Sequence, residues 1–324
     1  AGTIERDQQG TADTYIYNYW SSPVGVSNTT TNNNSYTLPN IMRDGTQSIN
    51  WLTSGYNGND TSPIGLADYW VWKYVNQLSD NYPSWQHVRS TGTLNVGEGF
   101  TMKGPGSGLP TDDQNYIFEG KPNNGDVNLT LSSGNDYLVG NPYASAIDAD
   151  EFIKDNIKDN GGRAASNIID GSIYFWEHFA NATHNLAEYE GGYATYSLMG
   201  STLAISNHIL ITQSNDVGTK TPGRYIPVSQ GFFVIADEGG TVSFKNSQRI
   251  YKKEGSGSSV FMRSNSAHSR ATTNNTEVDE RQKIKLMFDS SSGYHRQILV
   301  GVDEIATNQV DKGYDAKLAD EGVA

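Results

Sequence analysis

Thr14-Tyr15-Ile16-Tyr17-Asn18-Tyr19-Trp20 is a run of aromatic and β-branched residues near the start of the chain. Such residues suit a pleated, half-buried β-strand. Runs of the same kind recur at residues 69–74, 115–119, 127–131, 137–139, 172–177, 232–235 and 241–244. Turns rich in glycine, proline and asparagine separate these runs. Many short strands joined by such turns predict an all-β fold built from antiparallel, jelly-roll-like β-sandwich units.

Residues 147–156 are the one segment that departs from this pattern, and they predict a short helix. Asp148 stands at the N-cap position, and Glu151 follows three residues later. This spacing is typical of a helix start, because both side chains can bond backbone N–H groups that the first turn leaves unpaired.

An approximate internal repeat divides the strands into two related units. Each unit has an aromatic strand, a Val-x-x-Gly-Phe turn into a strand, and a closing aromatic strand. These segments are residues 70–74, 94–102 and 116–118 in the first unit, and 173–177, 226–234 and 242–244 in the second. The second unit is longer because it contains residues 181–222, which we interpret as a loop insertion rich in glycine, threonine and asparagine. Duplication explains the similarity, although a composition rich in aromatic residues gives such matches by chance as well.

The domain boundaries follow from these units. We expect β-sandwich units at residues 1–135 and 136–254. Residues 255–280 hold too few apolar residues to pack, and they predict an exposed linker. Residues 281–324 then begin a C-terminal β module with a hairpin, in which 282–288 and 294–300 alternate around a Ser-Ser-Ser-Gly turn. Two strands alone are marginal in water, so the hairpin must pack on the body or continue into a further module.

Composition and charge exclude several classes of protein. The chain has 324 residues, a net charge of −13 and no cysteine, so disulfide scaffolds and cysteine-ligated metal sites are excluded. The acidic charge repels nucleic acid, and we expect no nucleic-acid partner. No apolar run approaches the roughly 20 residues of a membrane-spanning helix. The chain opens without a basic and apolar leader, and we expect it to be a fragment of a longer protein.

Several motifs together resemble one known group of proteins. Gly140-Asn141-Pro142-Tyr143-Ala144-Ser145-Ala146-Ile147-Asp148 resembles a Gly-Asn-Pro-Tyr-x-Ser-x-Ile-Asp signature of large secreted proteins of Bacteroidota, especially flavobacteria. The accompanying pieces are residues 17–24, 97–100, 120–126, 174–177, 223–233, 295–297 and 311–315. Each piece is weak alone, but together they extend the resemblance over residues 14 to about 318.

The resemblance implies a region just upstream of a C-terminal sorting domain in cargo of the type IX secretion system. Such proteins cross the outer membrane, and many are adhesins, gliding-associated proteins or polysaccharide-active enzymes. This segment is usually the shared, non-catalytic part. We therefore expect an extracellular or outer cell-surface location. The expected partners are glycans or other surface proteins, with the secretion machinery engaged through a sorting domain outside this chain.

Catalytic motifs are absent from the sequence. It contains neither His-Glu-x-x-His nor Gly-x-Ser-x-Gly, so zinc-protease and α/β-hydrolase mechanisms lack their signatures. Glu177-His178 with His184 is the densest histidine cluster, and we interpret it as surface histidines beside a loop. Glu98 lies between two glycines, but Gln230 takes its place in the second unit, which favours a structural role. We predict no catalytic residue in this segment.

Acidic residues give one candidate metal site. Asp148, Asp150 and Glu151 cluster at the predicted helix start, and calcium takes six to eight oxygen ligands, often from loops. The spacing does not match the Asp-x-Asn/Asp-x-Asn/Asp-Gly loop. The same carboxylates also favour the helix dipole, so capping competes with Ca²⁺ binding as their role.

Aromatic residues give the candidate ligand site. The chain has 6 Trp and 19 Tyr, and rings with apolar faces and polar edges suit carbohydrates. Tyr56, Tyr82 and Trp85 lie in predicted loops, which carry function on rigid scaffolds. Trp70 and Trp72 would share one face of a strand, where core packing explains them equally well. Two functions remain open: a non-catalytic adhesin, stalk or spacer region, and a carbohydrate-binding module of a secreted polysaccharide-active enzyme.

Overall fold

The computed structural model describes most of the chain. The described residues are 2–27, 29–79, 81–106, 112–180, 183–185, 188–204, 218, 220–254, 259–263, 279–289 and 295–317. The strands, contacts and exposures given below are those of these residues.

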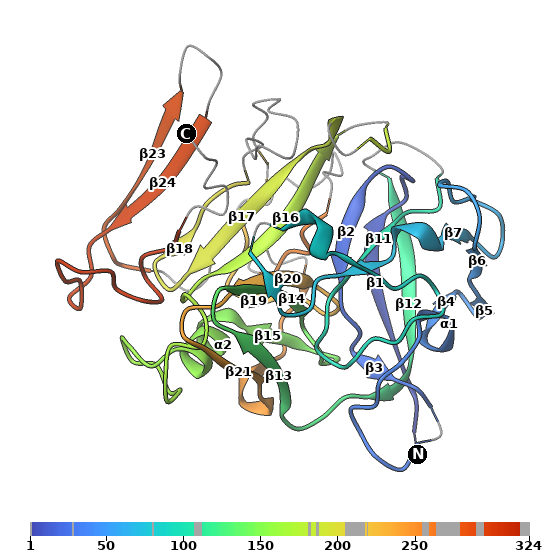
Figure 1. Cartoon of the computed structure of the whole chain (residues 1–324), viewed down its shortest axis with the longest axis horizontal. Coiled ribbons are helices and arrows are strands. Elements are labelled where there is room, and N and C mark those ends of the chain that lie inside the picture. Colours follow the sequence, from blue (N-terminus) through green and yellow to red (C-terminus); the bar gives the residue numbers. More distant parts are fainter. Residues whose placement is uncertain are drawn as a thin grey trace.

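Strands dominate the structure (Figure 1), which confirms the all-β prediction. The strands are β1 (Ile4–Thr11), β2 (Tyr17–Trp20), β3 (Val24–Gly25), β4 (Met42–Asp44), β5 (Gln47–Ser48), β6 (Asn50–Leu52), β7 (Gly65–Ala67), β8 (Trp72–Lys73), β9 (Gln77–Leu78), β10 (Gln86–His87), β11 (Phe100–Lys103), β12 (Asp113–Pro122), β13 (Val127–Ser132), β14 (Asn135–Gly140), β15 (Ala146–Asp148), β16 (Ile173–Ala180), β17 (Glu190–Ser197), β18 (Gly200–Ser201), β19 (Tyr225–Ile226), β20 (Gly231–Ile235), β21 (Gly239–Phe244), β22 (Arg249–Ile250), β23 (Lys283–Asp289) and β24 (His295–Gly301). The helices are α1 (Leu38–Ile41) and α2 (Ala149–Asn156), with short 3₁₀ turns η1 (Asp68–Trp70), η2 (Tyr82–Ser84) and η4 (Asn246–Gln248).

Two larger sheets organise the chain. In the first, β1 pairs with β12 along its whole length, from Ile4 opposite Gly120 to Thr11 opposite Asp113, and β3, β4 and β5 complete the sheet. The second sheet has the order β18-β17-β16-β20-β14-β9. Pairing is antiparallel throughout the described part except between β6 and β7.

Strand β2 lies between the two halves of the molecule. It pairs with β11, and Trp20 also bridges to Gln230 just before β20. Because successive side chains of a strand point to opposite faces, Tyr19 and Trp20 enter different hydrophobic clusters. The Trp20 cluster, which we call the N-terminal core, also contains Phe100 and Phe118. Tyr19 belongs to the aromatic core, which is made of Tyr19, Tyr74, Leu138, Tyr174, Trp176 and Phe233.

The third and largest cluster lies under α2 and the second sheet. It includes Val139, Phe152, Phe232 and Phe244, all of them fully buried. The predicted helix is confirmed as α2: the Asp148 carboxylate accepts a hydrogen bond from the backbone N–H of Asp150 at 3.0 Å.

Two predictions about irregular segments are wrong. Residues 181–222 are not simply a loop, because β17 lies within them and pairs with β16 from Tyr196 opposite Ile173 onward. The strand signal in this segment was the aromatic and β-branched sequence Tyr193-Ala194-Thr195-Tyr196. In the predicted linker, residues 259–263 are described, and Phe261 and Met262 are 4% and 1% exposed, so that part is buried. The other residues of 255–278 lie outside the described part of the chain.

The strand expected at residues 69–74 is largely replaced by the 3₁₀ turn η1, after which β8 covers only two residues. Trp70 and Trp72 therefore do not share one face of a strand: Trp70 is 7% exposed, and Trp72 is only partly buried.

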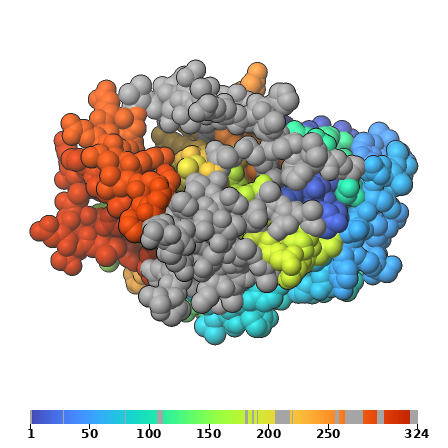
Figure 2. All heavy atoms as spheres, turned by 90° about the horizontal axis from the view of Figure 1, so that it is seen from above, coloured from blue at the N-terminus to red at the C-terminus, as the bar shows by residue number. Residues whose placement is uncertain are grey.

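The predicted C-terminal hairpin is confirmed as β23 and β24. It lies at one end of the molecule in both views, opposite the N-terminal half (Figures 1 and 2). One of its faces packs on the body, where Gln297 accepts a hydrogen bond from the backbone N–H of Leu203 at 3.1 Å. The other face is apolar and at least 45% exposed at Ile284, Leu286, Phe288, Ile298 and Val300.

The division into units of 1–135 and 136–254 stays a prediction. Strand pairing crosses its boundary, because β9 pairs with β14 and β13 pairs with β21. Within the described residues, no helix is both long and apolar enough to span a membrane.

Candidate functional site

The predicted ligand aromatics lie on the segment from Tyr56 to His87. This segment includes β7, which pairs with β6 in a small separate sheet, and β9, which belongs to the second sheet. The 3₁₀ turn η1 is held by Asp68, whose buried carboxylate accepts hydrogen bonds from Ser90 Oγ at 2.9 Å and Arg89 Nη1 at 3.2 Å. Trp70 Nε1 donates to the carbonyl oxygen of Tyr56 at 2.6 Å, which fixes the loop before η1.

Aromatic rings on this segment form a contiguous surface. Tyr69 contacts the rings of Tyr56, His87 and Trp72 edge to face, at centroid distances of 4.8, 5.1 and 5.9 Å. Trp72 and His87 are stacked at 3.9 Å, and His87 Nε2 donates to the carbonyl oxygen of Tyr69 at 2.9 Å. Burial, followed by the charge of the nearby Tyr69, raises the pKa of Tyr82. We call these five residues the aromatic surface.

The structure places two of the three predicted residues, Tyr56 and Tyr82, on this surface and packs Trp85 on the aromatic core. Tyr56 and Tyr82 are 54% and 52% exposed, so their rings are open to solvent. Trp85 is partly buried: it packs on Tyr74 at 5.3 Å and on Tyr19 at 6.1 Å. Trp85 therefore packs on the aromatic core, and its ring is the least accessible of the three.

Beneath the surface lies a buried lysine that the sequence motifs did not single out. Lys103 is 3% exposed, and its Nζ lies 3.8 Å from the ring centroid of Trp70, 4.5 Å from that of Tyr17 and 4.7 Å from that of Tyr189. Nζ also donates to Tyr189 Oη at 2.6 Å and to His184 Nδ1 at 3.1 Å. The sequence feature that could have indicated the position of Lys103 is the alternation in β11. Phe100 and Met102 enter the N-terminal core, and Lys103 points to the opposite face of the strand.

Burial lowers the pKa of Lys103 to about 6, and the charge of Asp13 opposes this shift. The amine is therefore largely uncharged at neutral pH. An uncharged amine has two N–H donors, and the two acceptors Tyr189 Oη and His184 Nδ1 engage both of them. Because the amine is sealed under the rings, its role in this conformation is structural.

The tautomer of His184 follows from its contacts with Asn57 and Lys103. His184 Nε2 donates to Asn57 Oδ1 at 2.6 Å, which leaves Nδ1 as the acceptor for Lys103. Burial, followed by the charge of Lys103, lowers the pKa of His184 to about 4 and that of His178 to about 3. Both rings are therefore neutral at physiological pH.

The interpretation of His178 as a surface histidine is wrong. Its side chain is 1% exposed, because β16 turns it inward, where Nδ1 accepts a hydrogen bond from the backbone N–H of Tyr17 at 3.2 Å. His184, in contrast, is only partly buried and stacks on Trp70 at 4.8 Å.

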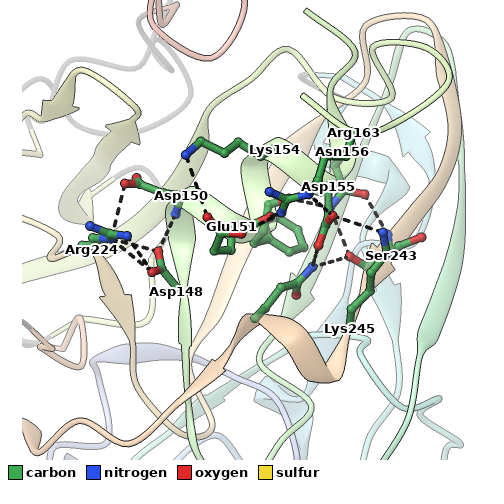
Figure 3. Close-up of polar contacts among 12 residues, drawn as sticks. Asp148, Asp150, Glu151, Lys154, Asp155, Asn156, Arg163, Arg224, Ser243 and Lys245 are labelled. Carbon is green, nitrogen blue, oxygen red and sulfur yellow. Dashed lines mark hydrogen bonds and ion pairs between the residues drawn. The ribbon is translucent and has the colours of Figure 1, made fainter. Parts of the chain in front are cut away.

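The predicted metal residues are held by cations of the chain itself (Figure 3). Asp148 makes a bidentate contact with Arg224, with Nε–Oδ1 and Nη2–Oδ2 distances of 3.0 and 2.9 Å. Asp150 lies 3.3 Å from Arg224 Nε and accepts a hydrogen bond from Tyr196 Oη at 2.8 Å. Glu151 lies 2.9 Å from Nη2 of Arg163, which comes from the loop after α2.

Comparison with known proteins gives one finding. A family model described as "Domain of unknown function (DUF8693)" matches residues 1–324. The chain belongs to the DUF8693 family. No curated protein and no solved structure matches it. The aromatic surface and the acidic cluster of this DUF8693 chain are therefore interpreted from their own chemistry.

The acidic cluster of the DUF8693 chain combines capping with ion pairing. Asp148 caps α2, Arg224 neutralises Asp148 and Asp150, and Arg163 neutralises Glu151. Among the described residues, no group of three or more His, Cys, Asp or Glu side chains is placed to hold a metal ion. The calcium site at Asp148, Asp150 and Glu151 remains a prediction that would require these arginines to move away.

A calcium titration checks this directly. We expect the unfolding midpoint to be the same in calcium chloride as in EDTA, because arginines already neutralise the three carboxylates. A site filled at 100 times its Kd would add about 2.7 kcal/mol to the free energy of unfolding. A stabilisation of that size by calcium, absent in Asp150→Asn, would support the predicted calcium site and contradict our expectation.

Proposed function

We propose that this chain is a non-catalytic β-sandwich region of a multidomain protein exported by the type IX secretion system. It acts outside the cell or on the outer cell surface as an adhesin, and its ligands are glycans that stack on the aromatic surface. The motif resemblance around Gly140–Asp148 supports the export route and the location. The exposed rings of Tyr56 and Tyr82, grouped around Tyr69, support the ligand class.

The physical argument rests on the amphipathic character of both partners. A pyranose ring has apolar C–H faces and hydroxyl edges, and an aromatic ring offers it an apolar face. Tyrosine adds a hydroxyl that can bond the sugar edge. The aromatic surface combines two exposed tyrosines with a stacked Trp72–His87 pair. Rings held in place by packing lose little conformational freedom when a ligand binds.

The buried Lys103 and His178 favour a binding role for the aromatic surface over a catalytic one. Lys103 and His178 are 3% and 1% exposed, so neither reaches a ligand on the surface. Both engage groups of the chain itself: Lys103 bonds Tyr189 and His184, and His178 accepts from the backbone of Tyr17. Their contacts position the aromatic rings.

A glycan array and affinity electrophoresis test the proposal. The wild-type chain should bind at least one algal or plant polysaccharide. Tyr56→Ala and Tyr82→Ala should each weaken that binding about twofold to tenfold, since a lost ring contact is worth about 0.5–1.5 kcal/mol. The matched control is Tyr251→Ala, because Tyr251 is 83% exposed but lies outside the aromatic surface.

Two outcomes would contradict glycan binding. Silence of the wild-type chain across the array would leave a stalk or spacer as its function. Equal losses in Tyr251→Ala and Tyr82→Ala would show that the aromatic surface is not the binding site.

A further inference from the structure

A polar groove of about 600 Å³ lies on the opposite side of residues 72–78 from the aromatic surface. Side chains in this stretch alternate: the ring of Trp72 joins the aromatic surface and that of Tyr74 the aromatic core, whereas Lys73 bonds Glu98 and Val75 lines the groove. β13 and the turn at residues 95–98 form other parts of its wall. Its volume falls within the range of small-molecule sites, about 300–1,000 Å³.

Amide side chains dominate the rim of the groove. They come from four separate parts of the fold and are Asn33, Asn76, Gln77, Asn95 and Asn128. Some of their atoms are already engaged. Asn76 Oδ1, for example, accepts from the backbone N–H of Ser132 at 2.7 Å, and Asn128 Oδ1 accepts from Ser243 Oγ at 2.9 Å. These bonds fix the orientation of the amides.

Other polar atoms on the rim have no hydrogen-bond partner within the described residues. They are Nδ2 of Asn128, Oε1 of Gln77, Oδ1 of Asn95 and Oγ1 of Thr130. The set therefore contains a donor, two acceptors and a hydroxyl that can act as either. A ligand matched to it must itself carry groups that both donate and accept, as hydroxyls do.

Apolar residues also line the groove. They are Val75, Val96, Val127, Leu129 and Tyr137. A lining that combines apolar residues with amides fits a ring with C–H faces and hydroxyl edges better than it fits a fully polar ion.

Charge narrows the ligand class further. Two carboxylates, those of Glu98 and Asp126, line the groove, and none of its lining residues is a cation. Lys73 neutralises Glu98 through a 3.0 Å ion pair, whereas Asp126 stands exposed at the rim. An anionic ligand would meet this charge without a compensating cation, so the groove favours an uncharged ligand.

We infer that this groove is a binding site for a neutral saccharide, separate from the aromatic surface. The C–H face of the sugar lies against Val75 and the other apolar lining residues, and its hydroxyls bond the free amide atoms of Asn128, Gln77 and Asn95. This inference does not depend on the aromatic surface, and either site can be absent while the other is present.

Saturation-transfer NMR and calorimetry with defined monosaccharides test the groove. The probes are glucose, galactose, mannose and N-acetylglucosamine, with glucuronate as the anionic counterpart. At least one neutral sugar should bind, and glucuronate should bind more weakly than glucose. Asn128→Ala and Thr130→Ala should each weaken binding about threefold to tenfold, because a hydrogen bond contributes about 0.5–1.5 kcal/mol. Both positions are exposed on β13, so the substitutions remove no core contact.

The matched control is Asn40→Ala, which removes an exposed amide outside the groove and should bind as the wild type does. Tyr82→Ala separates the two sites, since it should retain monosaccharide binding while weakening polysaccharide binding. The inference is overturned if no neutral sugar binds at millimolar concentration. It is also overturned if Tyr82→Ala abolishes monosaccharide binding while Asn128→Ala preserves it, an outcome that would support the aromatic surface alone.

Discussion

Trp20→Ala is expected to lower the free energy of unfolding by about 3–5 kcal/mol, which is more than most single substitutions cost. The indole is fully buried, and its ring lies 4.8 Å from that of Phe261 and 5.1 Å from that of Tyr116. Removing it deletes these contacts and leaves a cavity that the surrounding strands cannot close.

Two glycines, Gly10 and Gly231, make room for Trp20. A Cβ added at Gly10 would lie 2.4 Å from Cζ2 of the ring, and one at Gly231 would lie 2.9 Å from the backbone nitrogen of Trp20. Both glycines therefore allow a close approach that no other residue permits. Because β2 contributes Trp20 to one core and Tyr19 to another, the damage reaches both halves of the molecule.

Urea unfolding followed by circular dichroism measures this effect. Trp72→Ala is the matched control, since it deletes a partly exposed indole stacked on His87, and it should cost much less. A loss below about 1 kcal/mol in Trp20→Ala would mean that the N-terminal core repacks around the site, contrary to the described packing.

Lys103→Met is expected to remove about 2 kcal/mol of the rise of stability with pH between about pH 7.5 and about pH 9. The pKa of Lys103 is about 6 in the folded chain, below its ordinary value of 10.5, because burial disfavours the ammonium form. Between these values the unfolded chain holds a proton that the native chain lacks. The stability of the wild type therefore rises with pH across this window, by up to about 1.4 kcal/mol per pH unit.

Below about pH 6 both states of Lys103 carry the proton, so its contribution there becomes constant and unfavourable. Methionine keeps the length and apolar body of the side chain without an ionisable group, so the variant should lack the part of the rise that Lys103 causes. We expect the free energy of unfolding of the wild type to rise between about pH 7.5 and about pH 9 by about 2 kcal/mol more than that of Lys103→Met. Urea unfolding at these two pH values measures the difference.

The control for this prediction is Lys252→Met, which removes a lysine lying 4.3 Å from the ring centroid of Tyr225 nearer the protein surface. It should follow the wild-type profile. Parallel profiles for Lys103→Met and the wild type would show that Lys103 stays protonated among the rings, held by cation–π attraction. Lys220, whose burial lowers its pKa to about 8, contributes equally to every variant and cancels in the comparison.

The sequence correctly predicted the elements whose structure depends on residues that are close together in the chain. The N-cap at Asp148 predicted α2, and the alternation on either side of residues 290–293 predicted β23 and β24. In both cases the residues that decide the structure are neighbours in the chain. The loop expected at residues 181–222 failed because β17 gains its order from pairing with β16. Pairing of that kind depends on a register that composition does not reveal.

Burial of polar groups was harder to predict than the strands themselves. His178 and Lys103 are ordinary polar residues in sequence, yet they are almost fully buried. A strand's period of two shows that it has two faces, but it does not show which face a distant segment will cover. Lys103 is covered because His184 and Tyr189 approach from a part of the chain more than 80 residues away.

The amino-acid sequence is enough to show that this protein is all-β, that it holds together without disulfides, and where its helix and C-terminal hairpin lie. Its turn residues, alternating strands and lack of cysteine encode those features locally. The three-dimensional arrangement was needed to show which aromatic rings face solvent, which polar groups are sealed beneath them, and where amides from distant strands gather around one groove. The reason is that exposure and proximity are set by pairings such as that of β1 with β12, between residues more than 100 positions apart.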